Sequence, residues 1–209
     1  MDQRSNTIRA IETRYAGCHF RSRLEARWAV FFDAAGIAWE YEPEGFVLPD
    51  ETHYLPDFKL PKLRVWVEVK PEINARDTKW RPFHELINGP DHWMWASNDE
   101  ICESAIGIVP TPTANLIGWP WRTIMIGQVP DPRAIDYGIA IGPGSPHCGW
   151  EFRLCDMCGE IDLIHVIGSL ARCGHFNAGR NPETRDRRIT DAYEAARSAR
   201  FEWGQSGAT

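Results

Sequence analysis

Residues 54–70 read YLPDFKLPKLRVWVEVK, and this stretch decides the fold that the sequence predicts. The apolar, β-branched run at its end predicts a buried strand over 64–70, yet the run carries Glu68 and Lys70. A proline turn separates it from a second strand candidate, 54–60. Charged side chains in a buried strand are costly unless they are paired or bind a metal. The stretch therefore predicts a functional site on two neighbouring strands.

The charged residues of this stretch have the spacing of a metal site. Alternate residues of a strand point to the same face, so Glu68 and Lys70 share one side while Val67 and Val69 face the core. If the two strands pair as a hairpin, Asp57 comes close to Glu68. Two carboxylates offer the hard oxygen ligands that Mg²⁺ prefers, and Lys70 can orient or deprotonate a water beside the ion. The alternative is an exposed edge pair next to an ordinary turn aspartate.

The segment before these strands predicts an amphipathic helix over 22–35. Its apolar residues recur on one face at helical spacing: Leu24, Trp28, Phe31 and Phe32. Ser22 is a candidate N-cap with Glu25 at the third helical position, as in a capping box, and Gly36 ends the helix. We expect Glu25 to add a third carboxylate to the site.

The rest of the chain predicts alternating short elements. Strands are expected at 37–41, 46–48, 105–109, 123–126, 137–141 and 161–167, and helices at 77–88 and 190–203. Closely spaced turns favour an antiparallel meander for the strands up to residue 70. A Gly-Pro-Gly-Ser-Pro run after residue 141 is the clearest linker. We therefore expect one domain over 1–142 and a second over 147–209.

The combined motifs resemble the PD-(D/E)xK nuclease superfamily. The residues that carry the resemblance are S-R-L-E at 22–25, Y-L-P-D-F at 54–58 and W-V-E-V-K at 66–70. The block 20–70 is similar to phage-encoded nucleases, to transposon-end-cleaving endonucleases and to the Holliday-junction-resolvase-like branch. The resemblance implies an α/β fold with a restriction-endonuclease-like core, in which helices flank a mixed central sheet.

The resemblance also implies an activity and its residues. Asp57 and Glu68 would bind Mg²⁺ or Mn²⁺ with help from the Val69 carbonyl, Lys70 would position the attacking water, and Glu25 would complete the acidic site. The implied protein is a metal-dependent deoxyribonuclease that hydrolyses phosphodiester bonds. Its implied partner is DNA, branched or single-stranded, in repair or recombination. The sequence leaves open whether the protein is a homodimer.

A second candidate site lies near the C-terminus. Cys155-x-x-Cys158-Gly has the spacing of a zinc knuckle, and Cys173-Gly-His175 supplies a second ligand pair. These four ligands suit a closed, tetrahedral structural Zn²⁺ site in a small zinc-ribbon-like module that the metal stabilises. Two residues could substitute as ligands: Cys148 and His165. The alternative is a set of unrelated buried cysteines.

Composition limits the classes of function. A formal net charge of −6 argues against a uniformly basic nucleic-acid-binding surface, although arginines cluster locally. The N-terminus has no apolar signal core and no run has the length of a membrane span, so we expect a protein of the phage-infected or bacterial cytoplasm, with reduced cysteines. Two alternatives stay open: a non-catalytic, zinc-dependent protein that binds nucleic acid or another protein, and a hydrolase of RNA or another phosphoester.

Overall fold

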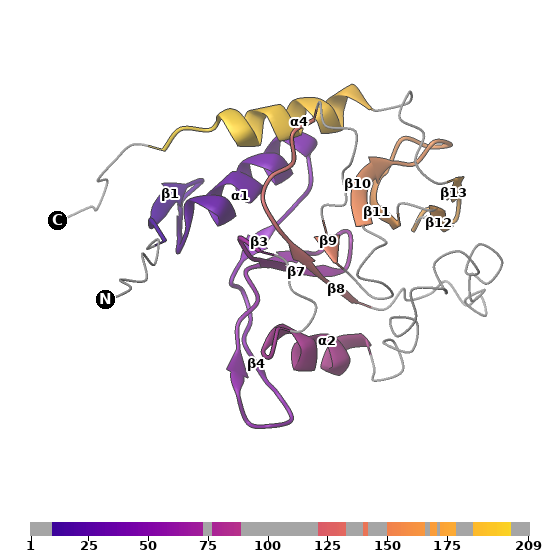
Figure 1. Cartoon of the computed structure of the whole chain (residues 1–209). Coiled ribbons are helices and arrows are strands. Elements are labelled where there is room, and N and C mark those ends of the chain that lie inside the picture. The colour runs from indigo at the N-terminus through magenta and orange to yellow at the C-terminus, as the bar shows by residue number, and fades with distance from the viewer. Residues whose placement is uncertain are drawn as a thin grey trace, which may run out of the picture.

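The computed structural model describes residues 10–72, 77–88, 121–132, 140–141, 150–165, 168–170, 172–178 and 186–201. These residues form a mixed α/β structure around one central sheet (Figure 1). The described helices are α1 (Arg23–Ala35), α2 (Trp80–Asn88) and α4 (Arg187–Ser198). None of them has the length and apolar character needed to cross a membrane.

Among the described residues, the central sheet has seven strands in the order β11-β10-β9-β8-β7-β6-β3. In chain order their bounds are β3 (Glu40–Tyr41), β6 (Phe58–Leu60), β7 (Val65–Val69), β8 (Arg122–Ile126), β9 (Ala140–Ile141), β10 (Trp150–Leu154) and β11 (Ile161–His165). Neighbouring strands are antiparallel except β7 and β8, which are parallel. Helix α2 lies in the connection between those two strands, as parallel pairing requires a crossover.

Three two-stranded hairpins surround this sheet. Their strands are β1 (Thr13–Tyr15) with β2 (Cys18–Phe20), β4 (Phe46–Val47) with β5 (His53–Tyr54), and β12 (Gly168–Leu170) with β13 (Phe176–Ala178). The β4–β5 hairpin projects beside α2, and the β12–β13 hairpin lies next to β10 and β11 (Figure 1).

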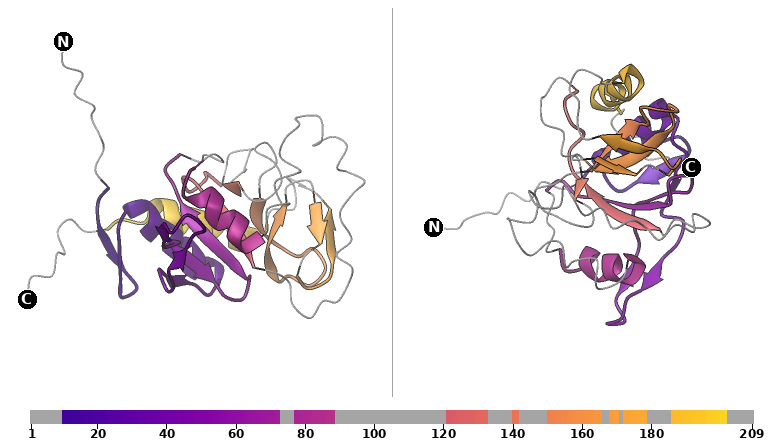
Figure 2. Two further views of the ribbon diagram at one scale, coloured as in Figure 1. Left: turned by 90° about the horizontal axis from the view of Figure 1, so that it is seen from below. Right: turned by 90° about the vertical axis from the view of Figure 1, so that its right-hand side faces the viewer.

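Helices cover both faces of the central sheet. Helices α1 and α4 lie side by side on one face, and α2 lies on the other face (Figure 2). The core under α1 and α4 is the larger one and contains Phe31, Phe32, Phe58 and Val67. The core under α2 consists of Leu48, Tyr54, Trp66, Trp80, Phe83 and Met125. Strand β7 is therefore buried on both faces, because Trp66 faces one core and Val67 the other.

Helix α1 confirms the expectation drawn from its sequence. The side chain of Ser22 caps the helix by accepting a hydrogen bond from the Glu25 backbone N–H, at 3.2 Å. Gly36 ends the helix with a φ of 74°, a left-handed conformation that glycine adopts without strain. The indole of Trp28 donates to the Gly127 carbonyl at 2.8 Å, which ties the helix to the chain after β8.

Several expected elements differ in extent from those observed. The segment 54–60 forms no single strand, because its first residue pairs in the β4–β5 hairpin and only Phe58–Leu60 joins the central sheet. The strands up to residue 70 are thus not one meander. The C-terminal helix begins earlier than expected, since the side chain of Asp186 caps it by accepting from the Arg188 N–H at 2.6 Å.

The expected linker at 142–146 and the expected strand at 105–109 lie outside the described residues. On either side of the linker the sheet is continuous, since Trp150 of β10 pairs with Ala140 of β9. The core is continuous as well: Phe152 of β10 lies 5.3 Å from Phe31 of α1 between ring centroids. The described parts of the two expected domains therefore share one sheet and one core.

Candidate functional site

The acidic site lies where β6 begins and β7 ends. Phe58 pairs with Val67 in the antiparallel register of these strands, so one step further places Asp57 opposite Glu68. The Asp57 carboxylate also reaches the neighbouring backbone, because its Oδ2 accepts a hydrogen bond from the Val69 N–H at 2.7 Å. The strand pairing expected from the sequence is thus present, and Val69 contributes a backbone donor to the site.

Burial and charge make this site unusual. Asp57 and Glu68 are only 7% and 6% exposed. The ammonium Nζ of Lys70 lies 2.6 Å from Glu68 Oε1, and the Lys70 side chain is 38% exposed. The partly exposed Lys70 therefore neutralises one of the two negative charges of this buried pair.

The surroundings of Asp57 raise the pKa of its carboxyl group. Burial, then the charges of Glu68 and Glu25, raise the pKa of Asp57 to about 8, against the lowering effects of the Val69 N–H and of Lys70. Without a further cation, the folded protein thus favours a protonated Asp57 near neutral pH. A divalent cation would favour the ionised form and would supply the missing positive charge.

The role of Lys70 follows from its own surroundings. Burial acts to lower the pKa of Lys70, but the hydrogen bond and charge of Glu68 outweigh burial and raise that pKa. Lys70 is therefore a stable cation in the metal-free protein. Of the two roles that the sequence allows, orienting a water fits this state better than removing its proton.

Glu25 stands beside these residues but is held separately. Both of its carboxylate oxygens accept hydrogen bonds, from the Ser22 hydroxyl at 2.6 Å, the Arg21 N–H at 3.1 Å and the Tyr41 hydroxyl at 2.7 Å. Its charge nevertheless acts on Asp57. The described geometry thus places Glu25 next to the site, with its oxygens already occupied by protein donors.

Two tyrosines that the sequence reasoning missed support these carboxylates. The Tyr54 hydroxyl donates to Glu68 Oε2 at 2.7 Å, as the Tyr41 hydroxyl does to Glu25. Burial, then the charge of Glu68, raises the pKa of Tyr54, so its hydroxyl stays protonated and remains a donor. The sequence does not reveal these two contacts, because each tyrosine lies on a different element from the carboxylate that it contacts: Tyr54 on β5 with Glu68 on β7, and Tyr41 on β3 with Glu25 on α1.

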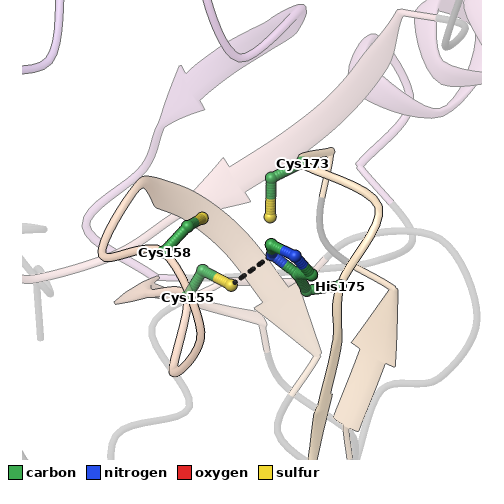
Figure 3. A group of neighbouring side chains, drawn as sticks. All are labelled: Cys155, Cys158, Cys173 and His175. Carbon is green, nitrogen blue, oxygen red and sulfur yellow. Dashed lines mark hydrogen bonds between the residues drawn. The ribbon is translucent and has the colours of Figure 1, made fainter.

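The structure brings together all four residues of the second predicted site, the cysteine–histidine cluster. The ligand atoms of Cys155, Cys158, Cys173 and His175 all lie within 4.8 Å of one another. The Cys155 Sγ and the His175 Nδ1 are 3.4 Å apart, and the four side chains converge on one point (Figure 3). Three thiols and an imidazole are the ligands of structural zinc sites, so this cluster can hold a zinc ion.

Two glycine turns position these ligands. Cys155 follows β10, and its N–H donates to the Glu160 carbonyl at 2.7 Å, which closes the turn that carries Cys158. Gly159 follows that turn with a φ of 72°, and Gly174 separates the other two ligands with a φ of 85°. Both turns need a left-handed residue, which explains the glycine that accompanies each ligand pair in the sequence.

Within the cluster the thiolate form is favoured at Cys155, whereas burial and the hydrogen bonds of Cys155 and Cys158 raise the pKa of Cys173 to about 11. Burial acts to raise the pKa of Cys155, but N–H groups of Met157 and Cys158 and the thiols of Cys173 and Cys158 outweigh it and lower that pKa to about 6. Because thiolate is the form that binds metal, Cys155 is prepared as a ligand. Cys148, one of the two possible substitutes, lies outside the described residues.

Within the described part of the chain, this cluster is the one group of three or more Cys, His, Asp or Glu side chains whose ligand atoms converge. Among the described acidic residues, the acidic site thus offers the carboxylates of Asp57 and Glu68, with Glu25 behind them. No family model, curated protein or solved structure matches this chain.

Proposed function

We propose that this protein is a metal-dependent deoxyribonuclease whose reaction centre is formed by Asp57, Glu68 and Lys70. One observation carries the proposal: two buried carboxylates lie opposite each other at the end of the β6–β7 pair, with an ammonium 2.6 Å from one of them. Burial, then the charges of Glu68 and Glu25, raises the pKa of Asp57 to about 8, and carboxyl groups with such raised pKa values are common at functional sites.

The donor set fits Mg²⁺ or Mn²⁺. Asp57 and Glu68 provide carboxylate oxygens, and the Val69 N–H fixes one oxygen of Asp57, which leaves the other oriented for a cation. When bound, such a metal supplies Lewis acidity toward a phosphate oxygen and lowers the pKa of a water. Lys70 holds Glu68 and presents a cation at the exposed side of the site, where it can orient the attacking water.

The fold is consistent with this proposal. The described residues form a mixed sheet flanked by helices, and Glu25 lies in the first helix beside the acidic pair, as the resemblance to the PD-(D/E)xK superfamily implies. Membership of that superfamily, and a restriction-endonuclease-like core, are part of the proposal. So is a structural zinc ion at the cysteine–histidine cluster, which would act as a support and not as a reaction centre.

The test is cleavage of supercoiled plasmid and of branched and single-stranded oligonucleotides with Mg²⁺ or Mn²⁺. We expect Asp57→Asn, Glu68→Gln and Lys70→Ala each to lose more than about 100-fold in rate, since each removes a group at the reacting centre. Glu85→Gln is the matched control, because it removes a carboxylate that pairs with Arg81 on α2. Full activity in all three site variants would refute the assignment. Preferential cleavage of an RNA counterpart would change the substrate class.

The cysteine–histidine cluster favours a second candidate, a zinc-dependent protein that binds nucleic acid or another protein without catalysis. This candidate predicts that the zinc-loaded protein binds DNA but does not cut it with any divalent metal. Binding that survives Asp57→Asn and Glu68→Gln, in the absence of any cleavage by the wild type, would favour it over the nuclease.

A further inference from the structure

A cavity of about 430 Å³ lies at the opposite end of α1 from the acidic site. Its walls come from the end of α1, from the turn between β6 and β7, from the start of β11 and the turn before it, from the loop that carries Cys173 and from the start of α4. Glu25 lies in the first turn of α1 and Gly36 caps its other end, and a helix of 13 residues is roughly 20 Å long. The cavity is thus a separate place on the molecule, within the size range of small-ligand sites.

Three basic side chains line this cavity from three different elements: Lys62, Arg172 and Arg188. Two acidic residues, Glu160 and Asp162, line it as well. Asp162 is already neutralised, because its Oδ1 lies 3.1 Å from Arg122 Nη2 in a buried ion pair. Only the exposed Glu160 remains to offset three cations, so the cavity carries an excess of positive charge.

The hydrogen-bond donors of the cavity are also unsatisfied in part. The Nε of Arg172 is buried and has no hydrogen-bond partner among the described residues. The other oxygen of Asp162 accepts a hydrogen bond from the Arg172 backbone N–H at 2.6 Å. Arg188 uses one nitrogen, Nη2, to donate to the Gly159 carbonyl at 3.2 Å and has further donors to offer. A buried donor without a protein partner can donate to a bound group that accepts hydrogen bonds.

The end of α1 opposes an anion only weakly. A helix C-terminus carries partial negative charge on its last carbonyls. Here the carbonyls of Phe32 and Asp33 accept hydrogen bonds from the N–H groups of Ile37 and Gly36, at 2.8 and 3.0 Å. These carbonyls are therefore capped, and the three side-chain cations dominate the local charge.

We propose that this cavity binds a phosphate group through Lys62, Arg172 and Arg188. A phosphate offers several acceptor oxygens at once, which suits donors that approach from three elements, and guanidinium groups bind phosphate with two parallel hydrogen bonds. The phosphate belongs either to a nucleic-acid backbone or to a free phosphate compound. The proposal holds whether or not the acidic site cleaves DNA.

The test compares exposed basic residues that line the cavity with exposed basic residues that do not. Lys62→Glu and Arg188→Glu place a negative charge in it. Lys79→Glu and Arg187→Glu are the matched controls, because Lys79 precedes α2 and Arg187, beside Arg188, is 92% exposed and pairs with Asp191. None of these positions contributes a buried side chain, so all four variants should fold, as circular dichroism and zinc content would check.

The first probe is inorganic pyrophosphate, titrated by calorimetry into the zinc-loaded full-length protein without magnesium. We expect saturable binding that weakens at least about tenfold in Lys62→Glu and Arg188→Glu and is unchanged in the two controls. Pyrophosphate binding of equal strength in all four variants would overturn the proposal. So would a wild type that binds neither pyrophosphate nor the DNA duplex described next in a saturable way.

The second probe is a labelled DNA duplex, followed by fluorescence anisotropy with Ca²⁺ in place of Mg²⁺. A selective loss of DNA affinity in the two cavity variants identifies the phosphate as part of a nucleic acid, and such a loss should shrink as salt is raised. Unchanged DNA affinity, together with weakened pyrophosphate binding, identifies a free phosphate compound. Plasmid cleavage in the same variants separates this proposal from the nuclease, since Asp57→Asn should abolish cleavage and leave pyrophosphate binding intact.

Discussion

The acidic site and the cysteine–histidine cluster show two ways of holding metal ligands in one chain. Asp57 and Glu68 are buried on paired strands, and protein donors fix an oxygen of each. Cys158 and Cys173 are exposed and stand on glycine turns. The sheet positions the carboxylates whether or not a metal is present, whereas the turns have little apolar surface to hold them together. A metal would therefore act on chemistry at the first site and on folding at the second.

Removal of zinc should have the largest effect. The Cys155→Ser, Cys158→Ser double variant should lose the metal and the structure of the surrounding turns, because structural zinc contributes on the order of 10 kcal/mol to such sites. Metal analysis should find about one zinc per chain in the wild type and none in the variant. Cys18→Ser is the control: Cys18 is a half-buried cysteine in β2, away from the cluster, and its loss should leave the zinc content unchanged.

Phe152→Ala tests whether the expected N-terminal and C-terminal domains unfold as one unit, because Phe152 of β10 packs against α1. Phe152 of β10 packs against Phe31 and Phe32 of α1, with ring centroids 5.3 and 5.8 Å apart, so its truncation should destabilise the whole chain by about 3–5 kcal/mol. Denaturant unfolding followed by tryptophan fluorescence should show one cooperative transition at a lower midpoint. Val47→Ala, at a 60% exposed position, should change stability by less than about 0.5 kcal/mol. Two separate transitions in the wild type would mean that the regions unfold independently.

The raised pKa of Asp57 predicts that the stability of the protein without magnesium depends on pH. The folded state keeps a proton on Asp57 up to about pH 8, whereas the unfolded chain releases it near the ordinary value of 3.8. The contribution of this group to stability is thus fully present below pH 3.8 and is lost as the pH rises toward 8. Thermal melts of the zinc-loaded protein without magnesium should show a melting temperature that falls across this range. The melting temperature of Asp57→Asn should fall less over the same pH range. Each kcal/mol of stability that Asp57 loses in the wild type corresponds to a difference of about 2–4 °C. An identical slope in both proteins would contradict the assigned pKa.

The smallest expected effect concerns a supporting hydroxyl. Tyr54→Phe removes the donor to Glu68 Oε2, and a buried hydrogen bond to a charged group contributes about 1.5–3 kcal/mol. We expect DNA cleavage to fall about tenfold and the midpoint of its Mg²⁺ dependence to rise. Tyr15→Phe is the matched control, because its hydroxyl contacts the exposed Asp33 at 2.8 Å outside the site. Equal behaviour of the two variants would show that Tyr54 only packs.

Local patterns in the sequence predicted several elements of this structure. The capping residues and apolar spacing of α1 identified the helix, and the β-branched run identified β7. The spacing of Cys155, Cys158, Cys173 and His175 identified the cluster that the structure gathers. Patterns of this kind are readable because a turn, a helix face or a ligand pair spans only a few residues.

Contacts between distant segments were not readable in the same way. The parallel pairing of β7 with β8 joins residues more than 50 positions apart, and no local signal marks it. The same holds for Tyr54 and Tyr41 beside the carboxylates, and for Arg122 paired with Asp162. Such contacts depend on how elements pack, which is settled by the burial of whole faces and not by neighbouring residues.

The sequence by itself determined the kinds of group present: an acidic pair with a lysine on strands, and three cysteines with a histidine on turns. Only the tertiary structure decided their surroundings. It buried Asp57 beside Glu68, filled the oxygens of Glu25 with protein donors and placed Lys62, Arg172 and Arg188 around one cavity. The physical reason is that charge, burial and hydrogen bonding act through space, so their effect on a group is fixed by its neighbours in the folded chain.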